Sequence, residues 1–260
     1  MEYAKLLESL SLYGTTREDV KKRRGHENIL ENVVIAPYWE HTLFSDCSIS
    51  ITQVSEKVYN IKGEDFEFSF IQIKNIGASS ILEEVLALGV TNVKRIIFIG
   101  SAGALDQDIK IGDLVVPTYS INGVGATRYL NEDLSDDFNV KYYPNENLTN
   151  RLVEVIDKMD LSVKRAPNYS VDTIIAQFPH INHIKRLGSQ TIEMETSAFF
   201  KCADMIGVES TALFVISDNT TVNKSLYSGR SEEDSFKRKK ARKELVPSIL
   251  VEFFKKINID

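Results

Sequence analysis

The chain has 260 residues, of which 43% are hydrophobic and 26% are charged, as is usual for a globular protein. Its formal net charge of −6 at pH 7 argues against a general nucleic-acid partner. No stretch approaches the ~20 apolar residues that a membrane-spanning helix needs, and the first residues carry charges where a signal peptide has an apolar core. Two widely separated cysteines, Cys47 and Cys202, indicate a reducing compartment, so we expect a cytoplasmic protein.

In chain order, the sequence begins with a helical segment and continues as strands and helices. Residues 1–30 are expected to be a helical extension, in which Thr16 and Asp19 form the Ser/Thr-x-x-acid pattern of a helix start. Beyond it, hydrophobic periodicity predicts a strand at 32–36, a strand at 65–73, a helix at 81–88, a buried strand that starts at 93 and runs into a glycine-rich turn at 99–103, a strand at 111–117 stopped by Pro117, helices at 148–159 and 197–207, a strand at 209–219 and a terminal helix at 232–257 with a bend at Pro247. This order is typical of one α/β domain, here residues 31–260, folded as an α/β/α sandwich with a central mixed sheet flanked by helices.

Three segments are predicted at the carboxyl edge of that sheet, where α/β proteins bind their ligands. The stretch IGSAG, residues 99–103, is consistent with a ligand loop and equally with a simple tight turn. Asp218 ends the apolar run ESTALFVISDN, either as a functional acid or as a turn-forming residue. In TIEMETSAFF, Glu193 and Glu195 flank Met194 at a helix start, where acids either favour the helix dipole or hold a ligand.

Taken together and in this order, these segments resemble the nucleoside phosphorylase superfamily, which includes purine nucleoside phosphorylase, uridine phosphorylase and the methylthioadenosine/S-adenosylhomocysteine nucleosidases. The resemblance is carried by FIGSAGALDQDIKIGDLVVP, VDTIIAQF, TIEMETSAFF and FVISDN, and it extends from about Asn32 to the terminal helix. It implies an enzyme that cleaves the bond between a ribose and a nucleobase without an organic cofactor. It also implies a homo-oligomer, whose interface we expect near the aromatic segment Tyr119–Tyr129.

The resemblance assigns the sugar and the leaving base to particular residues. Glu195, the second acid of the Glu-Met-Glu motif, would hold the ribose hydroxyls, and Met194 would lie against the sugar. Asp218 would stand near N7 of a purine and protonate it as the bond breaks. Glu193 is left with the task of capping the helix.

The resemblance also points to a nucleobase pocket and a loop for the nucleophile. Ile174 and Ile175 in VDTII match the pocket segment, although the family usually has an aromatic residue at the position of Ile174. Gly100 and Ser101 match the loop that holds the nucleophile, and Gly77 matches another glycine that lines the site.

The sequence departs from the phosphorylases where they bind phosphate through arginines. Phe98 stands where one family arginine precedes the loop glycine, and Thr42 stands where a second is expected. The nucleosidases use water and a glutamate after the first strand, and strand-on-strand alignment puts Glu40 at that glutamate, unless Glu40 is simply an exposed loop acid. Glu40, Asp218 and Glu195 would then supply the base, the acid and the sugar carboxylate of a hydrolysis.

Hydrolysis is therefore the predicted reaction, with phosphorolysis and a catalytically inactive nucleoside-binding protein as alternatives. Arg128 and Arg230 are the basic residues that could still hold phosphate, or they are ordinary surface arginines. The basic cluster FKRKKARK, residues 236–243, is expected to be the solvated face of the terminal helix. His180 and His183 lie three residues apart without a convincing set of further metal ligands, so no metal site is predicted.

Overall fold

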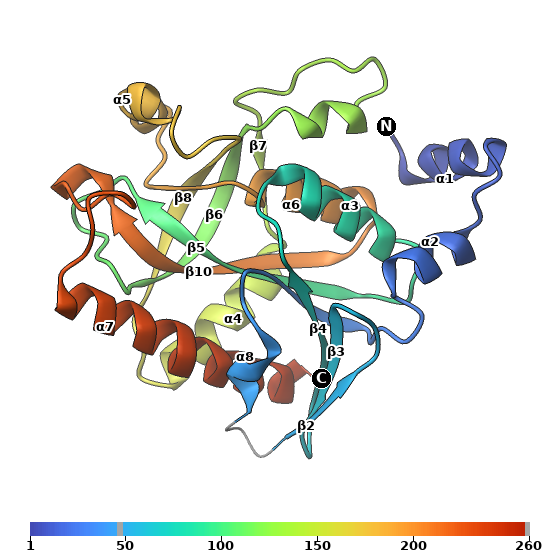
Figure 1. The fold of residues 1–260 in the computed structure, drawn as a ribbon, viewed down its shortest axis with the longest axis horizontal. Helices are drawn as coiled ribbons and strands as arrows, with labels where there is room; N and C mark the ends of the chain where they lie inside the picture. The colour runs from blue at the N-terminus through green and yellow to red at the C-terminus, as the bar shows by residue number, and fades with distance from the viewer. Residues whose placement is uncertain (46–48, 258–260) are drawn as a thin grey trace.

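A mixed β-sheet forms the centre of the protein (Figure 1). The computed structural model describes residues 1–45 and 49–257, and Cys47 lies outside them. The strands found in these residues are β1 (Asn32–Pro37), β2 (Ser50–Gln53), β3 (Val58–Lys62), β4 (Glu67–Ile73), β5 (Arg95–Ala104), β6 (Leu114–Gly123), β7 (Lys141–Tyr142), β8 (Val163–Val171), β9 (Thr191–Glu193) and β10 (Glu209–Asn219). Parallel and antiparallel pairs both occur, so the predicted α/β fold with a mixed sheet is confirmed.

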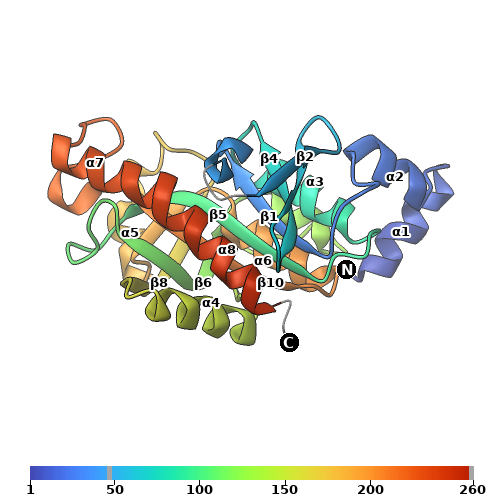
Figure 2. The ribbon, with the colours of Figure 1, turned by 90° about the horizontal axis from the view of Figure 1, so that it is seen from below.

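Helices flank the sheet on both faces. They are α1 (Tyr3–Leu12), α2 (Arg17–Arg24), α3 (Ala78–Leu88), α4 (Glu146–Lys158), α5 (Ile181–Arg186), α6 (Thr196–Met205), α7 (Glu232–Lys240) and α8 (Val246–Ile257). Side chains of α3 and α6 pack into one hydrophobic cluster on the sheet, and those of α4 and α8 pack into a second. Figure 1 shows these pairs above and below β5 and β10, and Figure 2 shows α7 and α8 crossing the face that α4 also covers.

The first strand illustrates how the sequence builds the two clusters. All six residues of β1 are buried, because helices cover both faces of the sheet there. Val33 and Ile35 belong to the cluster with α3 and α6, whereas Val34 and Ala36 belong to the cluster with α4 and α8. Side chains that alternate along a strand thus tie the two layers of helices to one sheet.

The sheet closes partly on itself, which the sequence did not predict. Strand β5 pairs with β1, with β9 and with β10, and the path β5, β10, β6, β8, β9 returns to β5. Strands β1, β4, β5 and β10 run parallel through their pairings, so their carboxyl ends lie at one edge. The segments that follow these strands therefore meet at that edge.

One predicted boundary needs correction. The strand expected to stop at Pro117 continues to Gly123 as β6, and its register with β8 shifts between Pro117 and Ser120. This irregularity accommodates a residue that lacks a backbone N–H, so proline interrupts the pairing without ending the strand. The terminal helix spans the predicted residues, from Glu232 at the start of α7 to Ile257 at the end of α8, and a π-helical turn at Ala241–Leu245 lies just before the predicted bend at Pro247.

The first 30 residues contain α1 and α2, in the segment expected to be helical. Thr16 and Asp19 form a capping box at the start of α2, as predicted: each side chain accepts a hydrogen bond from the backbone N–H of the other residue. In the described part of the chain, no helix has the length and apolar character needed to cross a membrane.

Candidate active site

Strand register places Asp218 and the segment TIEMETSAFF at the same end of the sheet. Asp218 on β10 pairs with Gly103 on β5, and Gly103 pairs in turn with Ile192 on β9. A Cβ atom at position 103 would lie 3.0 Å from Asp218 Oδ2 and 3.3 Å from Ile192 Cγ2, so a larger residue would displace its neighbours. Three adjacent strands thus bring the acid close to the entry of α6.

Glu195 occupies the N-cap position of α6, and its side chain connects α6 to a second helix, α3. Its Oε1 atom accepts a 2.5 Å hydrogen bond from the backbone N–H of Gly77, which immediately precedes α3. Gly77 has a φ of 100°, a left-handed conformation that favours glycine. The N-terminus of α3 therefore faces this carboxyl group, and its dipole favours negative charge there. Two residues expected in the site, Gly77 and Glu195, are in direct contact.

Glu193 has a separate, structural role. Its Oε2 atom accepts hydrogen bonds from the backbone N–H groups of Glu195 at 2.7 Å and Thr196 at 2.8 Å, so its predicted capping of the helix is confirmed. Its Oε1 atom accepts from Asn168 Nδ2 and Ser170 Oγ on β8, each at 2.6 Å. These four donors hold the Glu193 carboxyl group inside the protein and leave Glu195 as the acid free to meet a ligand.

The environment of Glu195 favours its protonated form. Burial, followed by the charge of Glu193, raises the pKa of Glu195 to about 8, against the smaller opposite effect of the Gly77 and Met194 backbone N–H groups. The carboxyl group therefore keeps its proton to a higher pH than an ordinary glutamate does. Hydroxyl groups that donate hydrogen bonds to it would favour the ionised form.

Asp218 is a buried acid whose pKa is raised. It is 9% exposed, and Ser217 Oγ donates a 2.5 Å hydrogen bond to its Oδ1 atom. Burial raises the pKa of Asp218, while the Ser217 hydrogen bond and the charge of Arg230 partly offset that rise. A carboxyl group with a raised pKa at the ligand edge of a sheet is suited to donating a proton to a leaving group.

The residues expected around the sugar and the base lie at the end of β8. Met194 is half-buried and packs against a small apolar cluster that includes Tyr169 and Val171. Ile174 and Ile175 follow this strand, and Ile174 is half-buried whereas Ile175 is 71% exposed. Ile174 is therefore partly covered by the protein, whereas the apolar side chain of Ile175 faces solvent.

Two aromatic residues that the sequence analysis missed lie between the base segment and the acid. The rings of Phe178 and Tyr227 have centroids 6.3 Å apart. Phe178 follows Ile174 in the same loop, and Tyr227 follows Leu226, whose backbone N–H helps to lower the pKa of Asp218. The sequence offered one indication of this pair. Ile174 stands where the family usually has an aromatic residue, so another aromatic side chain would be needed to stack on a base.

Gly100 and Ser101 lie within β5, so the turn expected at residues 99–103 is wrong. The strand continues because its neighbour β10 pairs with it over the same residues. Phe98 packs its ring against Phe199 and Phe214, with centroids 5.5 and 6.4 Å apart. A Cβ atom at position 100 would lie 2.9 Å from the Phe98 ring. The position that resembles a phosphorylase arginine is therefore filled by a core aromatic residue.

Glu40 follows β1 at the same edge of the sheet, but its surroundings are open. It is exposed, it accepts a 3.4 Å hydrogen bond from Thr42 Oγ1, and it interacts electrostatically with Arg242. Among the described residues no hydrogen bond joins Glu40 to Asp218 or Glu195. The ligand-free structure thus brings Gly77 and Glu195 together and leaves Glu40 at the rim.

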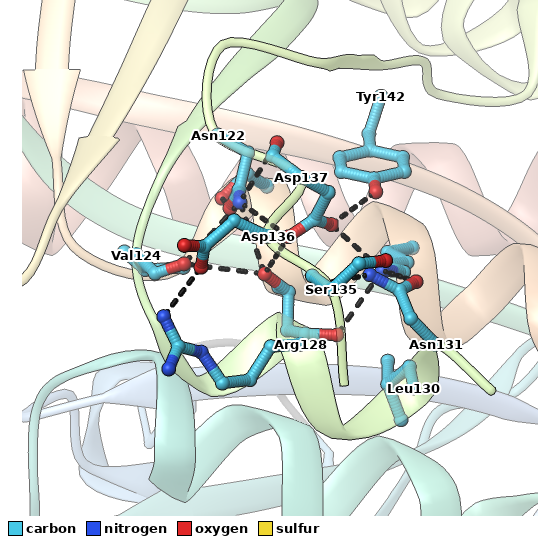
Figure 3. A network of polar contacts seen from close by, with 12 residues as sticks. Asn122, Val124, Arg128, Leu130, Asn131, Ser135, Asp136, Asp137 and Tyr142 are labelled. Carbon is cyan, nitrogen blue, oxygen red and sulfur yellow. Dashed lines mark hydrogen bonds and ion pairs between the residues drawn. The ribbon is translucent and has the colours of Figure 1, made fainter. Parts of the chain in front are cut away.

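Arg128 is occupied by a polar network beside α6 (Figure 3). Its Nη2 atom pairs with Asp136, while its buried Nε atom has no hydrogen-bond partner within the described residues. The neighbouring Asp137 accepts hydrogen bonds from Thr127 Oγ1 and from Lys201 Nζ on α6, each at 2.7 Å. These contacts hold residues 122–142 against α6 and give Arg128 a structural partner in place of phosphate.

The histidines give no sign of a metal centre. His180 and His183 are both exposed. Within residues 1–45 and 49–257, no group of three or more histidine, cysteine, aspartate or glutamate residues is arranged to hold a metal ion. The chemistry that this edge offers is therefore that of its carboxyl groups and backbone N–H groups.

Comparison with known proteins identifies the family. Residues 73–251 match the model of the phosphorylase superfamily, and the chain belongs to that superfamily. Among curated proteins, a DeoD-type purine nucleoside phosphorylase from Buchnera aphidicola subsp. Acyrthosiphon pisum is 26% identical over 146 residues, which are 56% of this chain and 60% of that protein. The match thus covers less than two thirds of the relative's length.

Solved structures show the same fold at low sequence identity. A 5′-methylthioadenosine/S-adenosyl homocysteine nucleosidase from Campylobacter jejuni has a TM-score of 0.68 and 18% identity, over 87% of this chain and 99% of that one. A uridine phosphorylase from Vibrio fischeri has a TM-score of 0.71 and 17% identity, over 88% and 93% of the two chains. An AMP nucleosidase from Bacteroides thetaiotaomicron has a TM-score of 0.65 and 16% identity, over 88% and 97%. Nucleosidases and phosphorylases thus share this fold.

Proposed function

We propose that this protein cleaves the N-glycosidic bond of a nucleoside or nucleoside derivative with water as the nucleophile. Glu195 accepts hydrogen bonds from the ribose hydroxyls, and Met194 lies against the sugar. Asp218 donates its proton to the departing base. The sugar develops positive charge as the bond breaks, and the Glu195 carboxylate stabilises that charge, while the ribose hydroxyls and the N-terminus of α3 favour its ionised form in the complex.

The observation that carries the choice of water is the packing of Phe98. A phosphate dianion needs arginines or many backbone N–H groups, and an unpaired buried dianion would cost several kcal/mol. Phe98 directs an apolar ring into the core with Phe199 and Phe214 at the position that resembles a phosphate arginine. Thr42, at the second such position, is exposed and bonded to Glu40.

Glu40 is the proposed base for the attacking water. It lies after β1 at the carboxyl edge and it is exposed, so a bound nucleoside would have to cover it before it could act on an isolated water molecule. Glu40→Gln should then reduce kcat by about 10²–10⁴-fold, the usual contribution of a general base. A wild-type kcat in that variant would exclude Glu40 as the base, and it would leave the proposed roles of Asp218 and Glu195 unchanged.

Phosphorolysis is the second candidate reaction, because the curated relatives are named purine nucleoside phosphorylases. A panel of purine and pyrimidine nucleosides, incubated with and without inorganic phosphate, separates the two reactions through the sugar product. Hydrolysis gives free ribose in both conditions, whereas phosphorolysis gives ribose 1-phosphate only with phosphate. Binding of a nucleoside without release of its base, in both conditions, would instead support the inactive binding protein.

A further inference from the structure

The first two helices enclose a groove that the proposed nucleoside site does not use. Helices α1 and α2 lie together at one end of the molecule, beside α3 (Figures 1 and 2). A cavity of about 750 Å³, which we call the N-terminal groove, is lined by residues of all three helices, among them Leu10, Arg23 and Leu86. Sites for small molecules usually measure roughly 300–1,000 Å³, so the groove is large enough for a ligand.

The N-terminal groove and the proposed active site lie at opposite ends of α3. Leu86 and Ala87, in the last turn of α3, line the groove, whereas Gly77, which contacts Glu195, immediately precedes the first turn. Helices α1 and α2 also precede residues 73–251, the part of the chain that matches the superfamily model. The groove is therefore a feature that this chain adds to the shared fold.

The wall that α1 supplies is apolar and incompletely covered. Leu6, Leu7 and Leu10 lie on one face of α1, because they are spaced three and four residues apart. All three are only half-buried, as is Val20 on α2, and neither helix buries any of its residues completely. An apolar face that the protein leaves partly open in a cavity is typical of a binding site for an apolar group.

Contacts at separate points hold the helices of the groove on α3. Tyr3 Oη donates a 2.6 Å hydrogen bond to the carbonyl oxygen of Leu86, and a Cβ atom at Gly89 would lie 2.5 Å from the Tyr3 ring. Just after α2, His26 Nε2 lies 2.5 Å from Glu84 Oε1, and both side chains are buried. The leucines of α1 cannot close the groove by moving toward α3 unless these contacts change.

Helix α2 supplies a basic wall. The carboxylate of Asp19 is occupied by the start of its own helix, where it accepts from the backbone N–H and the hydroxyl group of Thr16. Arg24 pairs with Glu83 across the groove. Lys22 and Arg23 are exposed side chains of the lining that form no ion pair with any residue the structure describes. The charge left at this wall is therefore positive.

We propose that the N-terminal groove binds a fatty acid, with its acyl chain against the leucines of α1 and its carboxylate at Arg23 and Lys22. Burial of the chain removes apolar surface from water, and a guanidinium group matches a carboxylate through paired hydrogen bonds. A single acyl chain suits the groove better than a membrane surface does, because the leucines are half-buried in a cavity, whereas Leu12 and Tyr13, the most exposed apolar residues of this segment, lie outside its lining.

Calorimetric titration of the full chain with octanoate, decanoate and decanol tests the site, at concentrations below those at which these compounds aggregate. Wild type should bind decanoate saturably, one molecule per chain. Its affinity for decanoate should exceed that for octanoate roughly tenfold, the effect of burying two further methylene groups. Decanol has the same chain without the charge, so it should bind more weakly than decanoate.

Two variants with matched controls locate the ligand. Leu10→Glu places a negative charge in the apolar wall and should abolish binding of decanoate. Its control Leu12→Glu makes the same change two residues further along α1, where the side chain is 83% exposed and outside the lining, and should bind as wild type does. Arg23→Gln should weaken binding about tenfold, whereas Arg17→Gln, on the same helix but outside the lining, should not. Arg23 is exposed, so its variant should fold normally.

Several results would overturn the site. They are the absence of saturable decanoate binding in wild type, equal affinities of wild type and Leu10→Glu, and equal affinities for decanoate and decanol. Sedimentation of the protein with vesicles of phosphatidylglycerol and phosphatidylcholine, without binding of dissolved decanoate, would instead make this end of the molecule a membrane-binding surface. Because binding is measured without a nucleoside, these results are independent of whether the protein hydrolyses one.

Discussion

Replacing Glu195 with glutamine should stabilise the protein at alkaline pH while harming its activity. Glutamine retains an Oε1 atom that can accept the hydrogen bond from Gly77, so the contact between the two helix starts is preserved. It cannot ionise, however, and the energetic cost of ionising a buried carboxyl group beside Glu193 disappears. The stabilisation should therefore depend on pH in a way that a purely structural effect would not.

The sign and size of this difference in unfolding free energy follow from proton linkage. The pKa of Glu195 is about 8 in the folded protein against 4.5 for an ordinary glutamate, so folding takes up a proton between these values. In that window the contribution of Glu195 to the unfolding free energy falls as pH rises, by at most about 1.4 kcal/mol per pH unit. The stability advantage of Glu195→Gln over wild type should thus grow from pH 5 to pH 8 and reach roughly several kcal/mol.

Urea denaturation at pH 5, 6, 7 and 8 measures this difference. Glu64→Gln is the matched control, because Glu64 is exposed and its variant should follow the wild-type pH dependence. A constant difference between Glu195→Gln and wild type across this range would refute the protonated, buried carboxyl group. In the wild type, kcat/KM should rise from pH 6 to pH 8, as Glu195 ionises to accept the ribose hydroxyls.

Three further predictions concern the acid, the base pocket and the assembly. Asp218→Asn should lower kcat by about 10²–10⁴-fold on nucleosides with poor leaving groups and should change substrate binding far less. Loss of binding with an unchanged kcat would make Asp218 a recognition residue. Tyr227→Ala should raise KM roughly 5- to 100-fold if the ring stacks on a base. The control Tyr13→Ala, at a distant and exposed residue, should leave KM unchanged. Equal KM values for Tyr227→Ala and wild type would exclude stacking. Sedimentation at micromolar concentration should show an oligomer that Tyr129→Glu dissociates, since Tyr129 is 67% exposed; a monomeric wild type would contradict this.

The sequence predicted most strands and helices because their hydrophobic periodicity matches the layers that bury them. It also predicted correctly that Glu193 caps the helix, whereas the role of Glu195 stays a prediction. It failed at Pro117, because a proline can be accommodated by a shift in strand register, which depends on the partner strand β8. The turn expected at 99–103 failed for a related reason, since pairing with β10 keeps the glycine-rich stretch extended.

The contacts between distant segments could not be predicted from local pattern. Phe178 and Tyr227 meet only because two loops converge near Asp218. Arg238 and Arg242 have the same local sequence environment as the exposed lysines beside them, and only the packing of α7 on Gly112 turns them inward. The role of Glu40 depends on what covers it, which its position after β1 does not determine.

The sugar product of base release tests the central claim most directly. Purified protein is incubated with a nucleoside panel in phosphate-free buffer and in buffer with inorganic phosphate, and free base and sugar are quantified together. Our account predicts base release with free ribose, or its 5′-substituted form, in both buffers, and a large loss of release in Asp218→Asn. Base release only in the presence of phosphate, with ribose 1-phosphate as the product, would contradict it.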